Sequence, residues 1–82
     1  MAFIATVNVM LKEGIADPQG QTIERALPAL GFSGVADVRV GKRIRLAVDA
    51  ASEDEAREQV RQMCDRLLSN PVIESYEVTL ES

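Results

Sequence analysis

Apolar and polar positions alternate near the start of the chain, which predicts an extended strand. Within residues 3–11 every odd position is apolar, whereas Ile4, Thr6, Asn8 and Met10 fall on the opposite face. A period of two with β-branched residues is typical of a strand in a sheet. Because Ile4 and Met10 are apolar, we expect the second face of this strand to be partly covered as well.

A second alternating stretch, residues 35–49, predicts two strands that form a hairpin. Apolar residues stand at positions 36, 38 and 40 and again at 44, 46 and 48, and most of the residues between them are charged. Gly41 and Lys42 lie between the two runs and supply turn chemistry. We therefore predict a hairpin with one apolar face and one partly basic face.

Apolar residues every three or four positions predict a helix after Asp17 and Pro18. Asp caps free backbone N–H groups at a helix start, and Pro fits the first turn because its missing N–H would be unpaired there. Gly31 is placed to end this helix in a left-handed conformation. Pro28 conflicts with a regular last turn, so we expect a kink or a shortened helix there. The apolar stripe consists of Ile23, Ala26, Leu27 and Leu30.

The second predicted helix begins at Ser52, where Ser52-Glu53-Asp54-Glu55 has the pattern of a capping box. Asn70-Pro71 ends it. Its apolar stripe consists of Ala56, Val60, Met63 and Leu67.

A last strand is predicted after Pro71, and it completes the order β-α-β-β-α-β. Val72, Tyr76, Val78 and Leu80 lie on one side of this strand, and Ser75, Glu77 and Thr79 lie on the other. Two split βαβ units of this kind predict an α+β, ferredoxin-like sandwich. We expect residues 1–82 to form one domain, with a four-stranded antiparallel sheet and both helices on one face.

Composition and charge narrow the possible partners. Hydrophobic residues make up 46% of the chain and charged residues 27%, which is typical of a folded domain. Nine basic residues against 13 acidic ones give a net charge of −4, which argues against binding nucleic acid or an anionic membrane. No apolar stretch is long enough to span a bilayer, and the start of the chain lacks the basic leader of a signal peptide. Because so short a chain has a thin margin of stability alone, we expect a protein partner, including a copy of itself.

The sequence holds few residues suited to catalysis or metal binding. It has no His, and its single Cys, Cys64, lies beside a helical apolar stripe, so we interpret this thiol as structural. A cation site is conceivable at the acidic cluster near the start of the second helix, but at a capped helix start such a cluster is typical of a solvated surface. The cluster consists of Glu53, Asp54, Glu55 and Glu58. We expect no catalytic residue, no cofactor and no metal in this chain. An unpaired thiol suits a reducing compartment, so we expect a cytoplasmic location.

Four residues are predicted to contact a partner: Ile4, Met10, Arg43 and Arg45. We choose them because they lie on the sheet face opposite the predicted helices. Arg39 can share the face of Arg43 and Arg45, where it would form either a phosphate or acidic-partner site or an ordinary solvated surface. The segments 17–20 and 71–73 are further candidates for contacts, although helix start and helix stop explain them equally well.

Several segments together resemble the PurS family, the small subunit of bacterial and archaeal phosphoribosylformylglycinamidine synthase. These segments keep their order and spacing over nearly the entire chain. Pro28 departs from the usual residue of the family. The matching segments are Val7–Gly14, Asp17–Gly20, Glu24–Leu27, Leu30–Phe32, Val38–Lys42 and Leu67–Glu74.

The resemblance implies a function that composition does not show. PurS-like subunits join the ATP-using synthetase PurL to the glutaminase PurQ, and the complex converts formylglycinamide ribonucleotide, glutamine and ATP to formylglycinamidine ribonucleotide in purine biosynthesis. The small subunit is implied to be a non-catalytic bridge that aids ammonia transfer and forms a homodimer or homotetramer.

Two other classes of function remain open. One is a ferredoxin-like regulatory domain that senses a small molecule, such as an amino acid bound at a dimer interface. The other is an enzyme that acts alone, with a carboxylate of raised pKa as its base.

Overall fold

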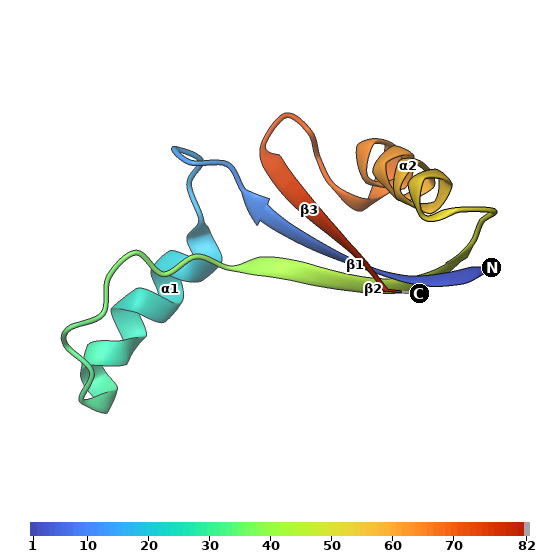
Figure 1. Ribbon diagram of the computed structural model, residues 1–82. Coiled ribbons are helices and arrows are strands. Elements are labelled where there is room, and N and C mark those ends of the chain that lie inside the picture. Colours follow the sequence, from blue (N-terminus) through green and yellow to red (C-terminus); the bar gives the residue numbers. More distant parts are fainter. Residues whose placement is uncertain (82) are drawn as a thin grey trace.

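A three-stranded antiparallel sheet with one helix packed on it forms the body of the protein, and a second helix projects beyond the sheet (Figure 1). The computed structural model describes residues 1–81. A 3₁₀ turn at Leu27–Leu30 follows α1, and a π-helical turn at Cys64–Leu68 follows α2. The elements are β1 (Ala2–Leu11), α1 (Pro18–Ala26), β2 (Gly41–Asp49), α2 (Glu53–Met63) and β3 (Glu74–Glu81).

The prediction of a four-stranded sheet is wrong. The strand order is β2-β1-β3, and residues 32–40 form no strand. Val38 and Val40 donate their backbone N–H groups to the side chains of Glu24 and Asp17 instead of to a neighbouring strand. Gly41 begins β2 and lies opposite Met10, so it is no hairpin turn. Local alternation alone does not provide a neighbouring strand for residues 35–40, and within residues 1–81 no further strand pairs with them.

The prediction that both helices cover one face of the sheet is also wrong. Only α2 packs against the strands, whereas α1 lies beyond the end of the sheet (Figure 1). The molecule is accordingly elongated, with extents of 52 × 25 × 14 Å. Within residues 1–81 the apolar stripe of α1 therefore covers no sheet.

The core lies between α2 and the odd-numbered face of β1. The alternation predicted for β1 is confirmed at Phe3, Ala5, Val7 and Val9, which are buried, whereas Leu11 is half-buried. In β3, Tyr76, Val78 and Leu80 pack against the core as predicted, but Val72 lies before the strand and is exposed. The buried apolar residues are Phe3, Ala5, Val7, Val9, Val48, Ala50, Ala56, Val60 and Cys64.

The predicted starts of both helices and the end of the first helix are confirmed. The Asp17 carboxylate accepts from the N–H of Gly20 at 2.9 Å, and the Ser52 hydroxyl accepts from the N–H of Glu55 at 3.2 Å. Pro28 shortens α1 as expected, because the chain tightens into the 3₁₀ turn that Gly31 closes with φ 97°. Over residues 1–81, no helix combines the length and the apolar character that crossing a bilayer requires.

Candidate interaction surfaces

Cys64 is a packing residue in this structure. Its side chain is fully buried against α2 and the sheet. Burial, and secondarily the charge of Asp65, raises the pKa of the Cys64 thiol. A thiol with a raised pKa is mostly protonated at neutral pH and is a poor nucleophile. Within residues 1–81 the side chains also form no group of three or more Cys, Asp or Glu suited to a metal ion.

The open face, defined here as the sheet face opposite α2, brings together the four predicted contact residues. In the register of the sheet, Arg43 lies opposite Asn8 and Arg45 lies opposite Thr6, while Ile4 and Met10 belong to the same face of β1. Both arginines are exposed, Met10 is 40% exposed and Ile4 is half-buried. The structure therefore places all four side chains on one accessible surface.

Charge on the open face is divided between its two edges. Arg43 and Arg45 stand on β2, whereas Glu77 and Glu81 stand on β3. Asn8 of the central strand lies opposite Arg43 on one side and Glu77 on the other. This row of the sheet therefore has a positive, a neutral and a negative side chain in order. At this row a partner docked on the open face would meet a positive edge, a neutral centre and a negative edge.

Arg39 does not join the two arginines of the open face. Its guanidinium donates to the carbonyl oxygens of Ile15 at 3.2 Å and Lys12 at 3.3 Å. Its Nε also lies 4.0 Å from the carboxylate of Asp17. Arg39 thus fastens the loop after β1 to the segment before β2, and the basic site is formed by two residues rather than three.

A projecting arm, residues 17–40, forms a second candidate surface. The Asp17 carboxylate is buried and accepts from the N–H of Val40 at 2.8 Å as well as from Gly20. These two N–H groups, with a smaller contribution from Arg39, hold the pKa of Asp17 below its usual value. Glu24, about two turns further along α1, accepts from the N–H of Val38 at 3.1 Å. Two carboxylates therefore tie α1 to the extended segment that enters β2.

Gly20 permits this close approach of helix and segment. A Cβ atom at residue 20 would overlap the backbone carbonyl oxygen of Val38. Sequence reasoning found the capping role of Asp17 but missed its bond to Val40, the bond of Glu24 and the need for Gly20. The only local signal was a Gly in the first turn of a helix, where Ala is normally favoured.

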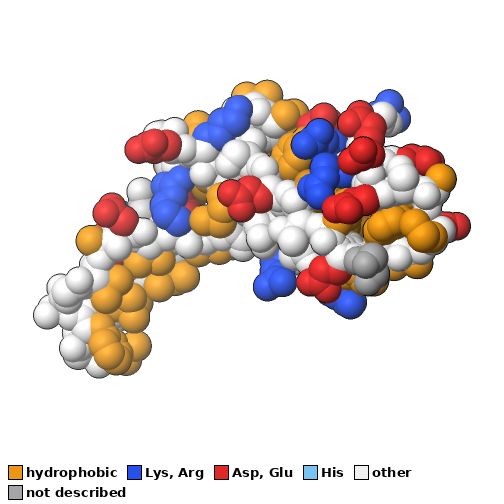
Figure 2. Space-filling model, in the orientation of Figure 1, with side chains coloured by type: hydrophobic (Ala, Val, Ile, Leu, Met, Phe, Trp, Pro, Cys, Tyr) orange, Lys and Arg blue, Asp and Glu red, His pale blue; other side chains and the backbone are white. Residues whose placement is uncertain are grey.

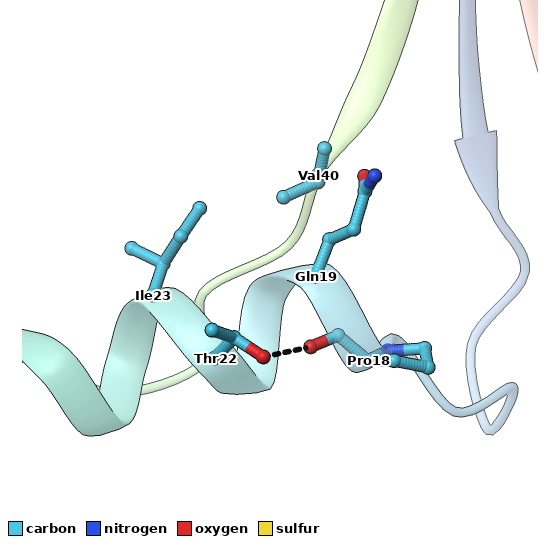
Figure 3. A pocket seen from close by; sticks show the side chains of 5 residues that line it. All are labelled: Pro18, Gln19, Thr22, Ile23 and Val40. Atoms are coloured by element: carbon cyan, nitrogen blue, oxygen red, sulfur yellow. Dashed lines mark hydrogen bonds between the residues drawn. The ribbon is translucent and has the colours of Figure 1, made fainter.

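The arm exposes much of its apolar surface. Figure 2 shows hydrophobic side chains along one side of the arm, from the sheet to the tip. Figure 3 shows Ile23 and Val40 lining a shallow pocket together with Pro18, Gln19 and Thr22. The exposed fractions are 44% for Ile23, 71% for Leu30, 57% for Phe32 and 43% for Val35.

The loop between α2 and β3 is the remaining predicted contact segment. Lys12 donates from Nζ to the carbonyl oxygen of Pro71 at 2.8 Å, which joins this loop to the end of β1. Val72 is 77% exposed and Leu67, just before the loop, is 81% exposed. The segment 71–73 therefore presents an apolar side chain at the surface in addition to ending the helix.

Sequence comparison with known proteins shows to which class of protein this chain belongs. A family model described as phosphoribosylformylglycinamidine (FGAM) synthase, PurS, matches residues 4–82. The chain is 44% identical over 77 residues to the PurS subunit of this synthase from Methanocaldococcus jannaschii, covering 94% of this chain and 93% of that protein. The PurS subunit from Mycobacterium leprae is 45% identical over 78 residues, covering 95% of each chain. These matches define the class as a subunit of a glutamine-dependent ligase complex.

Solved structures agree with the sequence matches. A crystal structure of PurS from M. jannaschii, one of the subunits of formylglycinamide ribonucleotide amidotransferase in the purine biosynthetic pathway, superposes with a TM-score of 0.86 at 42% identity and covers 98% of this chain and 96% of that chain. A chain in the structure of PurLQS from Thermotoga maritima gives 0.89 at 38% identity and covers 99% of each chain. This chain belongs to the PurS family, and it is a subunit of phosphoribosylformylglycinamidine synthase in purine biosynthesis.

Proposed function

We propose that this chain is a non-catalytic scaffold that bridges the glutaminase and the ATP-dependent synthetase and aids the passage of ammonia between them. The observation that carries the proposal is the match over 99% of the chain to a subunit of the PurLQS complex of T. maritima. The buried, protonated thiol of Cys64 and the absence of His from the sequence support a role in assembly rather than in bond making. Family membership favours this scaffold over a small-molecule sensor or an enzyme that acts alone.

Protection of ammonia gives the scaffold a physical purpose. Ammonia released by a glutaminase is a nucleophile only while unprotonated, and at neutral pH bulk water converts most of it to ammonium. A subunit that fixes the spacing of two active sites and covers the seam between them shortens the exposure of ammonia to water. The shape and the contact surface of the subunit are sufficient to protect ammonia in this way, and no reactive side chain is needed.

The open face is the proposed contact with the partner enzymes. Ile4 and Met10 supply apolar area at its centre, while Arg43 and Arg45 supply the positive edge. Charged groups at the rim of an interface chiefly set orientation and the rate of association, while the apolar centre contributes to affinity. A cytoplasmic location and a homodimer or homotetramer are part of the same proposal.

The test is a double charge reversal, Arg43→Glu with Arg45→Glu, in the complex reconstituted from all three subunits. We expect the complex to lose mass by light scattering and its glutamine-dependent turnover to fall about tenfold or more, because like-charge contacts at an interface cost several kcal/mol. Turnover with free ammonia should stay unchanged, since the synthetase then needs no bridge.

A matched control reverses two arginines away from the open face, Arg61→Glu with Arg66→Glu. Both side chains are exposed on α2 and the π-helical turn. This variant carries the same change in net charge and should assemble normally. Unchanged complex mass and unchanged glutamine-dependent turnover in the Arg43 and Arg45 variant would reject the open face as the contact.

A further inference from the structure

β3 forms one edge of the sheet, and its outer side is not covered by another strand. The strand order is β2-β1-β3, so within residues 1–81 no strand pairs with the far side of β3. The strand is rich in side chains that favour extended structure, namely Tyr76, Val78, Thr79 and Leu80. An edge strand of this kind is a template for pairing with other chains, and folded proteins normally carry a device that blocks it.

The register of the sheet shows which backbone groups of β3 face outward. Lys12 donates its backbone N–H to the carbonyl of Ile73 at 2.8 Å, so the odd positions of this part of the chain direct their backbone groups toward β1. Backbone groups alternate along a strand, so those of the even positions face the outer edge. The outward positions are Glu74, Tyr76, Val78 and Leu80.

Two of the outward positions are already occupied by contacts within the chain. The N–H of Glu74 donates to the carbonyl of Asn70 at 2.7 Å, which closes the start of the edge. The carbonyl of Val78, near the middle of β3, accepts from the guanidinium of Arg57 at 3.4 Å. Tyr76 lies alone between these two contacts, and Leu80 lies alone beyond them. An added strand therefore meets no run of adjacent unoccupied positions.

Arg57 is held beside the edge by its own helix. α2 packs on the sheet next to β3 (Figure 1). Glu53, one turn earlier on α2, binds the guanidinium of Arg57 with a distance of 3.3 Å between the carboxylate oxygen and the nitrogen. The side chain of Arg57 is 33% exposed, so most of it lies against the protein. Its bond to Val78 is long, so the main obstacle to another strand is the charge, which pairing would remove from water.

We propose that Arg57, oriented by Glu53, blocks the outer edge of β3 against pairing with a strand of any other chain. A sheet with an open edge extends by adding further strands, whereas a subunit of an enzyme complex has to stop at a defined size. Glu77 and Glu81 on the open face add repulsion against a second β3, because like charges on opposite strands are destabilising. This proposal concerns the folded chain alone and does not depend on the scaffold function proposed above.

A simpler role for Arg57 would be an ordinary ion pair within one helix. Such a pair contributes little to stability, and its removal would not change how the chain associates. The two roles therefore differ in the association of the chain rather than in its stability, so the test has to measure both quantities.

Arg57→Met tests the block in the full chain. Met keeps an unbranched side chain that favours a helix, but it removes the charge and the contacts with Glu53 and Val78. Arg61→Met is the matched control, because it makes the same change in charge at an exposed position one turn further along α2. Arg57→Lys keeps a cation beside the edge and should restore the block.

The rate of association is followed at equal concentrations by light scattering and by thioflavin T fluorescence. We expect Arg57→Met to form species larger than those of wild type at least about tenfold faster, because an unblocked edge adds strands. Arg61→Met and Arg57→Lys should stay within about threefold of the wild-type rate. Urea unfolding of each variant measures the stability of the folded chain separately.

Hydrogen exchange identifies the surface through which larger species form. The assembled Arg57→Met protein is exposed to deuterated water, then dissolved and analysed residue by residue by NMR. Pairing at the edge should protect the amides of Tyr76, Val78 and Leu80, whose N–H groups face outward in the single chain.

Faster association of Arg57→Met with new protection of these three amides supports the block. An association rate equal to that of Arg61→Met would overturn the proposal. Faster association without protection of the three amides would also overturn it, because the larger species would then form through unfolding or through another surface. Equally fast association of Arg57→Lys and Arg57→Met would show that the charge is not the obstacle, which again rejects the proposal.

Discussion

Replacing Gly20 by Ala tests whether the arm is held by close packing of α1 against the segment before β2. Gly20 lies in the first turn of α1, and its α-carbon faces the backbone carbonyl of Val38. A Cβ atom there would overlap that carbonyl oxygen, which belongs to the backbone and cannot rotate away as a flexible side chain would. The helix and the segment must therefore move apart, which strains the bonds that Asp17 and Glu24 make to Val40 and Val38.

The sign of the change in unfolding free energy shows whether residue 20 lies in open space or in a close contact. With open space at residue 20, Ala would stabilise the helix by roughly 0.5–1 kcal/mol relative to Gly. Overpacking a close contact costs roughly 1–3 kcal/mol. We therefore expect a net loss of about 1–2 kcal/mol in the free energy of unfolding. For a domain of this size that loss lowers Tm by about 5–15 °C.

Gly34→Ala is the matched control. Gly34 lies in the same arm, has no positive φ, and a Cβ atom there would meet nothing within 4 Å. Ala at such a site should leave Tm unchanged or raise it slightly, because it restricts the unfolded chain. Differential scanning calorimetry at one protein concentration measures both variants. A Tm for Gly20→Ala equal to or above that of wild type would refute the close-packing argument.

Two further predictions follow from ionisable groups. Hydrogen bonds lower the pKa of Asp17 in the folded state. The ionised carboxylate therefore stabilises the fold fully above the unfolded-state pKa of about 3.9. This stabilisation is lost as the pH falls through the lower folded-state pKa. Urea titrations should show that the difference in unfolding free energy between wild type and Asp17→Asn is constant above about pH 5 and becomes smaller below about pH 4. A difference that stays constant down to about pH 2 would contradict this prediction. Burial shields the Cys64 thiol and raises its pKa. A thiol reagent at about pH 8 should therefore react at least about tenfold faster with the chain in ~8 M urea than in buffer. Equal rates would show that the thiol is accessible in the folded chain.

Short-range patterns in the sequence were sufficient to predict most of the individual helices and strands. The alternation in residues 3–11, the Asp17 and Ser52 caps, the effect of Pro28 and the left-handed Gly31 all depend on neighbours within a few positions. The open face was also predictable, because the parity of a strand fixes which residues share a side. Ile4, Met10, Arg43 and Arg45 were therefore placed on one surface before the register of the sheet was known.

The tertiary structure alone decided what lies next to the segment before β2 and where α1 goes. Hydrophobic alternation specifies that a strand needs a neighbour and an apolar stripe needs a cover, but it does not specify from which part of which chain they come. Here Asp17, Glu24 and Gly20 bind α1 to residues 38–40 and hold the arm away from its own sheet. Those contacts join residues 14 to 23 positions apart, a separation at which a single sequence carries no periodic signal.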